Sequence, residues 1–222
     1  MRPTLKENMS SLSMSDFLSD VKYAAEHTLA IVWHDWEDAH ALAHQVHELK
    51  ALVADGYGRS SALALDPLDA EDLADATGAL WDTYFGPGKD LDAATLALDE
   101  LEARLAVRRF SIAATSGSVL QFAKQGISLV HAGLGSCPDG RQVTASQTLK
   151  NVAWQGRNQA MHWEEGNLKT PVQACFAALS TEAGPLGPQF QDPYVGSLAF
   201  DVLRVLGWKT WTEFETDMLL LA

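Results

Sequence analysis

Apolar residues recur at helical spacing along most of the chain, and no stretch of useful length alternates apolar and polar positions as a strand does. The longest helical pattern covers residues 16–55, which contain neither Pro nor Gly. Ser13 or Ser15 suits the N-cap before Asp16, and Gly56 is predicted to end the helix. Its apolar stripe consists of Leu29, Val32, Trp33, Trp36, Ala39, Ala43 and Val46.

The same spacing predicts further helices beyond residue 68, separated by turn-rich connections at 56–68, 133–140 and 183–193. They are expected over 69–85, from Asp90 or Asp92 to 132, from Thr144 or Ser146 to Gly166, and over 172–179, 194–206 and 211–221. Local residues refine these limits: Gly86-Pro87-Gly88 is a stop, Ser116-Gly117-Ser118 a kink or break, Pro171 a first-turn residue, and Thr212 with Glu215 a capping box.

These elements predict an all-α fold, a helical bundle with long antiparallel helices. The chain shows no internal repeat, no low-complexity block and no linker between two domains. We therefore expect a flexible N-terminal tail over 1–14 and a single helical domain over 15–222.

Composition agrees with an ordinary globular protein, since 47% of the 222 residues are hydrophobic and 20% are charged. No apolar run approaches the roughly 20 residues of a membrane span, and the N-terminus lacks the apolar core of a signal peptide. Cys137 and Cys175 form no Cys-x-x-Cys motif and no disulfide framework, which favours structural cysteines in a reducing cytoplasm.

Charge is distributed unevenly along the chain. The net charge of −13 argues against general nucleic-acid binding, because Lys and Arg hold phosphate backbones. Residues 103–163 nevertheless contain seven basic residues and one acid, so this stretch carries +6 and the rest of the chain −19. A basic stretch within an acidic chain favours a local anion site. The alternative is that Arg104, Arg108 and Arg109 pair with acids of a neighbouring helix.

The basic stretch contains a compact polar set, Arg157, Asn158 and His162, within NVAWQGRNQAMHWEEG (151–166). Arg presents a charged fork to phosphate oxygens, His exchanges a proton near neutral pH, and Asn binds a hydroxyl or phosphate oxygen. On a helix Asn158 and His162 share a face, whereas Arg157 and His162 are about 140° apart. Either Arg157 swings round, or the helix loosens near His162, or a two-fold dimer joins two motifs. The simpler alternative is a surface helix turn with a capping His.

A second polar pattern is a histidine ladder on the first long helix. His40, His44 and His47 lie at i, i+4, i+7, with Glu37 one turn earlier. Such a face can chelate a transition metal, which would make the protein a metal-dependent helical-bundle enzyme. Packing or interface histidines are the alternative, because no second His cluster exists to supply further ligands.

RNQAMH resembles the Arg-x(4–6)-His signature of HEPN domains, in which a polar residue often follows the Arg. The run SVLQFAKQGIS, a loop with Cys-Pro-x-Gly-Arg, and the helix with GRNQAMHWEEG are also similar to prokaryotic HEPN proteins, over approximately 96–178. The resemblance implies an all-α HEPN-like bundle that forms a homodimer with motifs lining a cleft. It further implies a metal-independent endoribonuclease without cofactor, often a toxin or phage-defence effector with a cognate antitoxin, that leaves a 2′,3′-cyclic phosphate and a 5′-hydroxyl.

The residue chemistry agrees with these implied roles. His162 would move the proton, Arg157 would stabilise charge on the phosphate, and Asn158 would orient a hydroxyl or a phosphate oxygen. Lys124 and Gln125 are expected to contact phosphate, and Glu164 and Glu165 to form a solvated helix end or pair with Arg157. A non-catalytic HEPN module that binds a nucleotide or a protein partner is the alternative function.

Overall fold

The computed structural model describes residues 12–65 and 87–222, and over these ranges the fold is all-α, as predicted. The only β-type pairing in these ranges is an isolated bridge between Gln142 and Thr148. The α-helices are α1 (Met14–Leu65), α3 (Pro87–His131), α4 (Leu149–His162), α5 (Thr170–Glu182), α6 (Ala199–Leu206) and α7 (Trp211–Leu219). Short 3-10 helices are η2 (Leu134–Ser136), η3 (Trp163–Glu165) and η4 (Gly184–Phe190).

The chain divides into two compact units. Unit 1 comprises Met1–Asp35 and Phe110–Ala222, and unit 2 comprises Trp36–Arg109. The tail over 1–14 falls mainly on residues outside the described ranges, as does the helix expected over 69–85. The tail and the single domain over 15–222 stay predictions.

Unit 2 pairs the second part of α1 with the first part of α3. Val46, Val53 and Leu105 are among its buried apolar residues. The ion pairs Lys50–Glu102 and Arg108–Asp38 join the two helices. One arginine of the basic stretch, Arg108, therefore pairs with an acid of the neighbouring helix, as the alternative interpretation expected.

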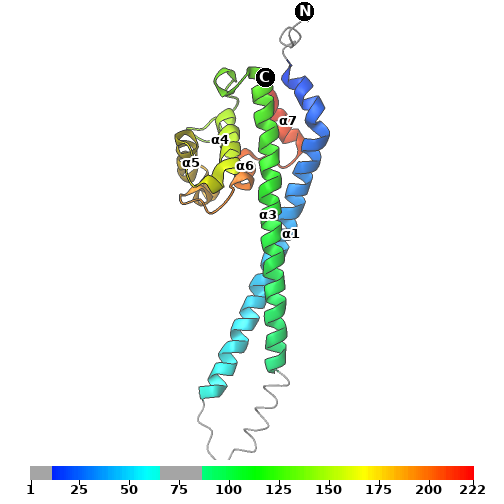
Figure 1. Ribbon diagram of the computed structural model, residues 1–222, viewed down its shortest axis with the longest axis vertical. Coiled ribbons are helices and arrows are strands. Elements are labelled where there is room, and N and C mark those ends of the chain that lie inside the picture. Colours follow the sequence, from blue (N-terminus) through cyan, green and yellow to red (C-terminus); the bar gives the residue numbers. More distant parts are fainter. Residues whose placement is uncertain (1–11, 66–86) are drawn as a thin grey trace, which may run out of the picture. The chain divides into compact units, whose positions relative to one another are not determined.

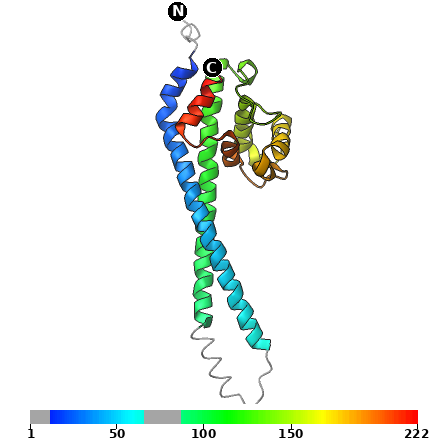
Figure 2. The ribbon, with the colours of Figure 1, turned by 180° about the vertical axis from the view of Figure 1, so that it is seen from behind.

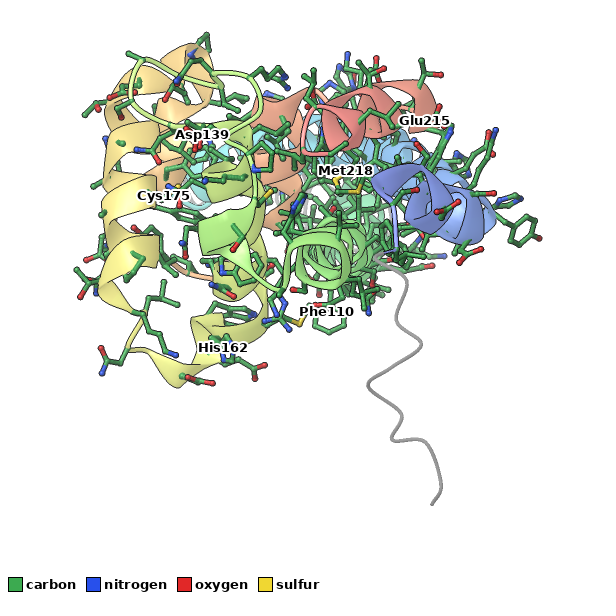
Figure 3. The ribbon with its side chains drawn as sticks, turned by 90° about the horizontal axis from the view of Figure 1, so that it is seen from above. Phe110, Asp139, His162, Cys175, Glu215 and Met218 are labelled. Carbon is green, nitrogen blue, oxygen red and sulfur yellow. The ribbon has the colours of Figure 1, made fainter. Side chains whose placement is uncertain are left out.

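Unit 1 contains the main core. Figures 1 and 2 show α4, α5 and α6 grouped beside α3, with α7 next to α3 and the first part of α1. Gly126 of α3 marks a close approach, because a Cβ there would lie 2.7 Å from Phe17 of α1 and 2.8 Å from Met218 of α7. Figure 3 shows Met218 on the side of α7 that faces α3. The largest fully buried side chains of this core are Trp208, Phe176, Phe190 and Phe214.

An ion pair joins the loop before α4 to α7. Arg141 donates from Nε and Nη2 to the two carboxylate oxygens of Asp217, both at 2.7 Å, and from Nη2 to the Leu206 carbonyl at 2.6 Å. The indole of Trp208 donates to the same carboxylate at 2.7 Å. Asp217 is 5% exposed, so these donors replace the water that its charge requires.

Several predicted boundaries are wrong. Helix α1 does not end at Gly56 but continues through Gly56 and Gly58 to Leu65, because each glycine inside a helix costs only about 1 kcal/mol. Helix α3 begins at Pro87 and runs unbroken through Ser116-Gly117-Ser118. The capping box of α7 is formed by Thr210 and Glu213, two residues before the predicted pair.

Candidate functional site

Helix α4 carries the motif and is held by two close helix contacts. A Cβ on Gly156 would lie 2.7 Å from Val202 Cγ1 of α6, so this approach depends on glycine. On the α3 side, a Cβ on Gly117 would lie 3.4 Å from the Met161 methyl and 3.7 Å from Ala160 Cβ. The helix begins at Leu149, later than predicted, because residues 141–148 form a bonded turn in which Leu149 N–H donates to the Arg141 carbonyl at 2.9 Å.

Arg157 is oriented by neutral side chains. Its Nε donates to Gln121 Oε1 of α3 at 2.6 Å, and its Nη1 lies 3.5 Å from Asn158 Oδ1. Within residues 12–65 and 87–222, no carboxylate lies at ion-pair distance from Arg157. No described carboxylate therefore competes with an external anion for the guanidinium.

Asn158 belongs to a chain of amide side chains that we call the amide ladder. Asn158 donates to Gln155 at 3.3 Å, Gln155 to Asn151 at 3.3 Å, and Asn151 to Gln147 at 2.7 Å. These residues are three or four apart and so share one face of the helix. The ladder holds the Asn158 amide with its oxygen toward Arg157. Sequence reasoning missed this role of Gln147, Asn151, Gln155 and Gln121, although the i, i+4 spacing of the first three was visible.

Lys124 supplies a second positive charge next to Arg157. Its Nζ lies 5.0 Å from the centroid of the Trp154 ring of α4. Burial, and secondly the charge of Arg157, lower the pKa of Lys124 below the ordinary lysine value. The two cations therefore interact electrostatically, and the role of Lys124 as a phosphate contact stays a prediction.

Gln125 is not in hydrogen-bond contact with Arg157 or Asn158 among the described residues. Its side chain is exposed and lines a hollow of about 480 Å³ between α3 and α1, together with Phe17, Asp20 and Lys124. Lys124 is thus common to both surroundings, because it lines the hollow with Gln125 and interacts electrostatically with Arg157.

His162 stands at the point where α4 ends. Its backbone, with φ −131° and ψ 9°, leaves the α-helical region, and η3 follows directly. One of the three expected geometries, a helix that loosens near His162, is therefore present. The imidazole Nδ1 lies 2.6 Å from Glu165 Oε1, and about half of the His162 side chain (49%) is exposed. Figure 3 shows His162 at the edge of unit 1.

Arg157 and His162 are not bonded to each other within one chain. Arg157 is held toward α3 by Gln121, whereas His162 is held by Glu165 of the following turn. Glu165 is exposed at the end of η3, which agrees with the expected solvated helix end, but its hydrogen-bond partner is His162 and not Arg157. Sequence reasoning also missed the contact between Glu165 and His162, although their i, i+3 spacing was visible.

The histidine ladder of unit 2 does not form a metal centre. His40, His44 and His47 are exposed, as is Glu37. No three His, Cys, Asp or Glu side chains of the described residues are placed to hold a metal ion together. His40 instead stacks on Trp36 with 5.5 Å between ring centroids, and His44 lies 3.4 Å from Glu48. The alternative of a metal enzyme built on these residues gains no support.

Among the described helices, none combines the length and the apolar character that a membrane span requires. Comparison with protein-family models, with curated proteins and with solved structures finds no match to this chain.

Proposed function

We propose that the protein is a metal-independent endoribonuclease of HEPN type that cleaves RNA through attack of a 2′-hydroxyl on the neighbouring phosphate. The observation that carries the proposal is a pair of cations, Lys124 and Arg157, that interact electrostatically and are not ion-paired with any described carboxylate, together with an exposed imidazole, His162, five residues after Arg157. Two neighbouring cations without a counterion favour an anionic ligand, and an RNA phosphate is such a ligand.

Each residue of the motif has a proposed role in this reaction. His162 removes the proton of the 2′-hydroxyl, and the 2′-oxygen forms a bond to phosphorus while the P–O5′ bond breaks. An imidazolium returns a proton to the 5′-oxygen, so the products are a 2′,3′-cyclic phosphate and a 5′-hydroxyl end. Arg157 and Lys124 stabilise the charge that develops on the phosphoryl oxygens, and Asn158 orients the phosphate or the hydroxyl.

We further propose that a second copy of the chain completes the site. Arg157 and His162 of one chain are held by different partners, so one composite site would combine Arg157 of one copy with His162 of the other. Two exposed apolar side chains support a contact on this side of unit 1. Phe110 is 75% exposed and lies on the same side as His162 in Figure 3, and Met161, next to His162, is 41% exposed.

The primary experiment incubates purified protein with total RNA in the presence of EDTA. The wild type and His44→Ala, which removes an exposed histidine of unit 2, should both cleave RNA. Arg157→Ala and His162→Ala should lose activity by 100-fold or more, on the order of the contribution of an acid–base or charge-stabilising group. Cleavage that is unchanged in both motif variants, or that EDTA abolishes, refutes the proposal.

Mixing the two inactive variants tests the composite site. Random exchange makes half of the dimers heterodimers, and each heterodimer would contain one intact site, so about a quarter of wild-type activity should return. Recovery of no activity from verified heterodimers refutes a site shared between copies. A monomer in solution at activity-assay concentration refutes it as well.

Gln121→Glu tests the neutral surroundings of Arg157. The substitution keeps the side-chain shape but places a carboxylate 2.6 Å from the guanidinium Nε, which would neutralise the cation. We expect weaker binding of inorganic phosphate and of RNA, with the fold retained. Tight nucleotide binding by the wild type without cleavage of any RNA would instead favour a non-catalytic binding module.

A further inference from the structure

The turn after α4 folds one carboxylate back onto the motif histidine. η3 spans Trp163–Glu165, and Gly166 closes the turn with φ +67°, a conformation that glycine adopts easily. The Gly166 N–H donates to the Trp163 carbonyl at 3.3 Å. This turn brings Glu165 Oε1 to 2.6 Å from His162 Nδ1.

The contact determines which imidazole nitrogen carries the proton. An ionised carboxylate is an acceptor only, so the hydrogen between the two side chains belongs to Nδ1. A neutral imidazole has one N–H, and with that hydrogen on Nδ1 the lone pair is on Nε2. The His162 ring therefore presents Nε2 as a base, away from Glu165.

The same contact keeps the carboxylate away from the guanidinium. Arg157 is bonded by Gln121 and Asn158, both neutral, and Glu165 is bonded to the imidazole. A Glu165–Arg157 pair would instead neutralise the charge that an anion needs. Glu165 is thus bonded to the imidazole of His162, whereas only the amide side chains of Gln121 and Asn158 are bonded to Arg157.

We infer that Glu165 is a positioning residue that fixes His162 as the Nδ1–H tautomer with Nε2 free to accept the substrate proton. This catalytic meaning rests on the proposed ribonuclease function, whereas the tautomer itself does not. Stability is a minor part of the contact, because an exposed ion pair of this kind contributes little to the free energy of folding. Both side chains are roughly half exposed or more, at 49% and 63%.

Glu164 provides a matched control. It has the same charge, is exposed, and precedes Glu165 by one residue. Among the described contacts, His162 is hydrogen-bonded to Glu165 and not to Glu164. Glu165→Ala and Glu164→Ala therefore change the net charge equally, and only the first removes the hydrogen bond.

Imidazole NMR of ¹⁵N-histidine-labelled protein tests the tautomer without reference to activity. The spectrum of His162→Ala identifies the His162 signals, and spectra are recorded above about pH 8, where an ordinary imidazole is neutral. The wild type and Glu164→Ala should show His162 mainly as Nδ1–H, and Glu165→Ala should shift it toward Nε2–H. A wild-type His162 that is mainly Nε2–H, or a tautomer that Glu165→Ala leaves unchanged, overturns the inference.

Kinetics then test the catalytic meaning. Glu165→Ala should lower kcat about tenfold with little change in KM, because part of the acid–base contribution is lost while substrate binding is kept. Glu164→Ala should leave kcat unchanged. Equal kcat for Glu165→Ala and the wild type overturns the positioning role. If the wild type cleaves no RNA, the proposed function fails, and the NMR comparison alone decides whether Glu165 fixes the imidazole.

Discussion

Gly156 allows α4 to approach α6 closely, and replacing it with alanine tests the packing of these two helices. A Cβ at residue 156 would lie 2.7, 3.1 and 3.3 Å from the Cγ1, Cγ2 and Cβ atoms of Val202. Carbon atoms pack best at about 3.5–4.0 Å, so one side must move. Val202 cannot turn away easily, because valine in a helix has one strongly preferred χ1 rotamer. Val202 is also fully buried.

The magnitude follows from two opposing effects. Overpacking of this kind costs about 1–3 kcal/mol. Replacing glycine by alanine inside a helix returns about 1 kcal/mol. We therefore expect Gly156→Ala to lower the free energy of unfolding by about 1 kcal/mol, with the overpacking term dominant. Val202→Ala should lower it by about 2 kcal/mol through the cavity left by two buried methyl groups.

The double variant separates this explanation from a general loss of stability. The new methyl at 156 occupies the space that Val202→Ala vacates, so the double variant should be more stable than the sum of the single changes predicts, by about 2 kcal/mol. Urea unfolding followed by helical circular dichroism measures all four proteins. Additive changes, or a stabilised Gly156→Ala variant, would show that α4 and α6 are not packed as described.

Three further predictions concern the surroundings of the site. Asp217→Asn leaves the half-buried Arg141 without its carboxylate and should lower the free energy of unfolding, measured in urea, by about 2–3 kcal/mol. Breaking a fully buried ion pair costs more, about 3–5 kcal/mol. The pKa of Lys124 is lower in the folded protein than its ordinary value of 10.5. Below the folded pKa, the charge on Lys124 lowers the free energy of unfolding. This loss of stability disappears as the pH rises from the folded pKa through 10.5. Lys124→Met should therefore flatten the rise of stability with pH in that window, measured by urea midpoints. Burial raises the pKa of Cys175 to about 12 and that of Cys137 above its usual value, so neither thiol should react with a disulfide reagent in native protein at pH 8, and both should react in urea.

Each of these has a result that contradicts it. An Asp217→Asn variant as stable as the wild type would mean that water replaces the carboxylate without cost. Equal pH slopes for Lys124→Met and the wild type would contradict the lowered pKa of Lys124, whose larger cause is burial and whose second cause is the charge of Arg157. A thiol that reacts in the native state would place at least one cysteine outside the core; Figure 3 shows Cys175 on α5 facing into the group of helices that includes α4.

Periodicity alone determined the fold class and the existence of most helices. Helix α5 contains Pro171 in its first turn as predicted, because proline fits there without losing a hydrogen bond. Ser116-Gly117-Ser118 misled the prediction, since residues that break an isolated helix are tolerated inside a packed one. Gly117 is buried against Met161 and Ala160, and the Ser118 hydroxyl bonds back to the Ala114 carbonyl. Packing against α4 therefore outweighs the tendency of these residues to break the helix.

For the motif, too, some features follow from the sequence and others only from the tertiary structure. The sequence by itself determined that Arg157 and Asn158 are adjacent, that Asn158 shares a face with His162, and that this set lies in a basic stretch, because these follow from spacing and charge. It left open whether Glu165 is solvated or pairs with Arg157, and it did not foresee the contact with His162, which depends on the turn at the end of α4. Only the tertiary structure placed Gln121 and Lys124 beside Arg157, because contacts between separate helices depend on how those helices pack, and no local pattern encodes that.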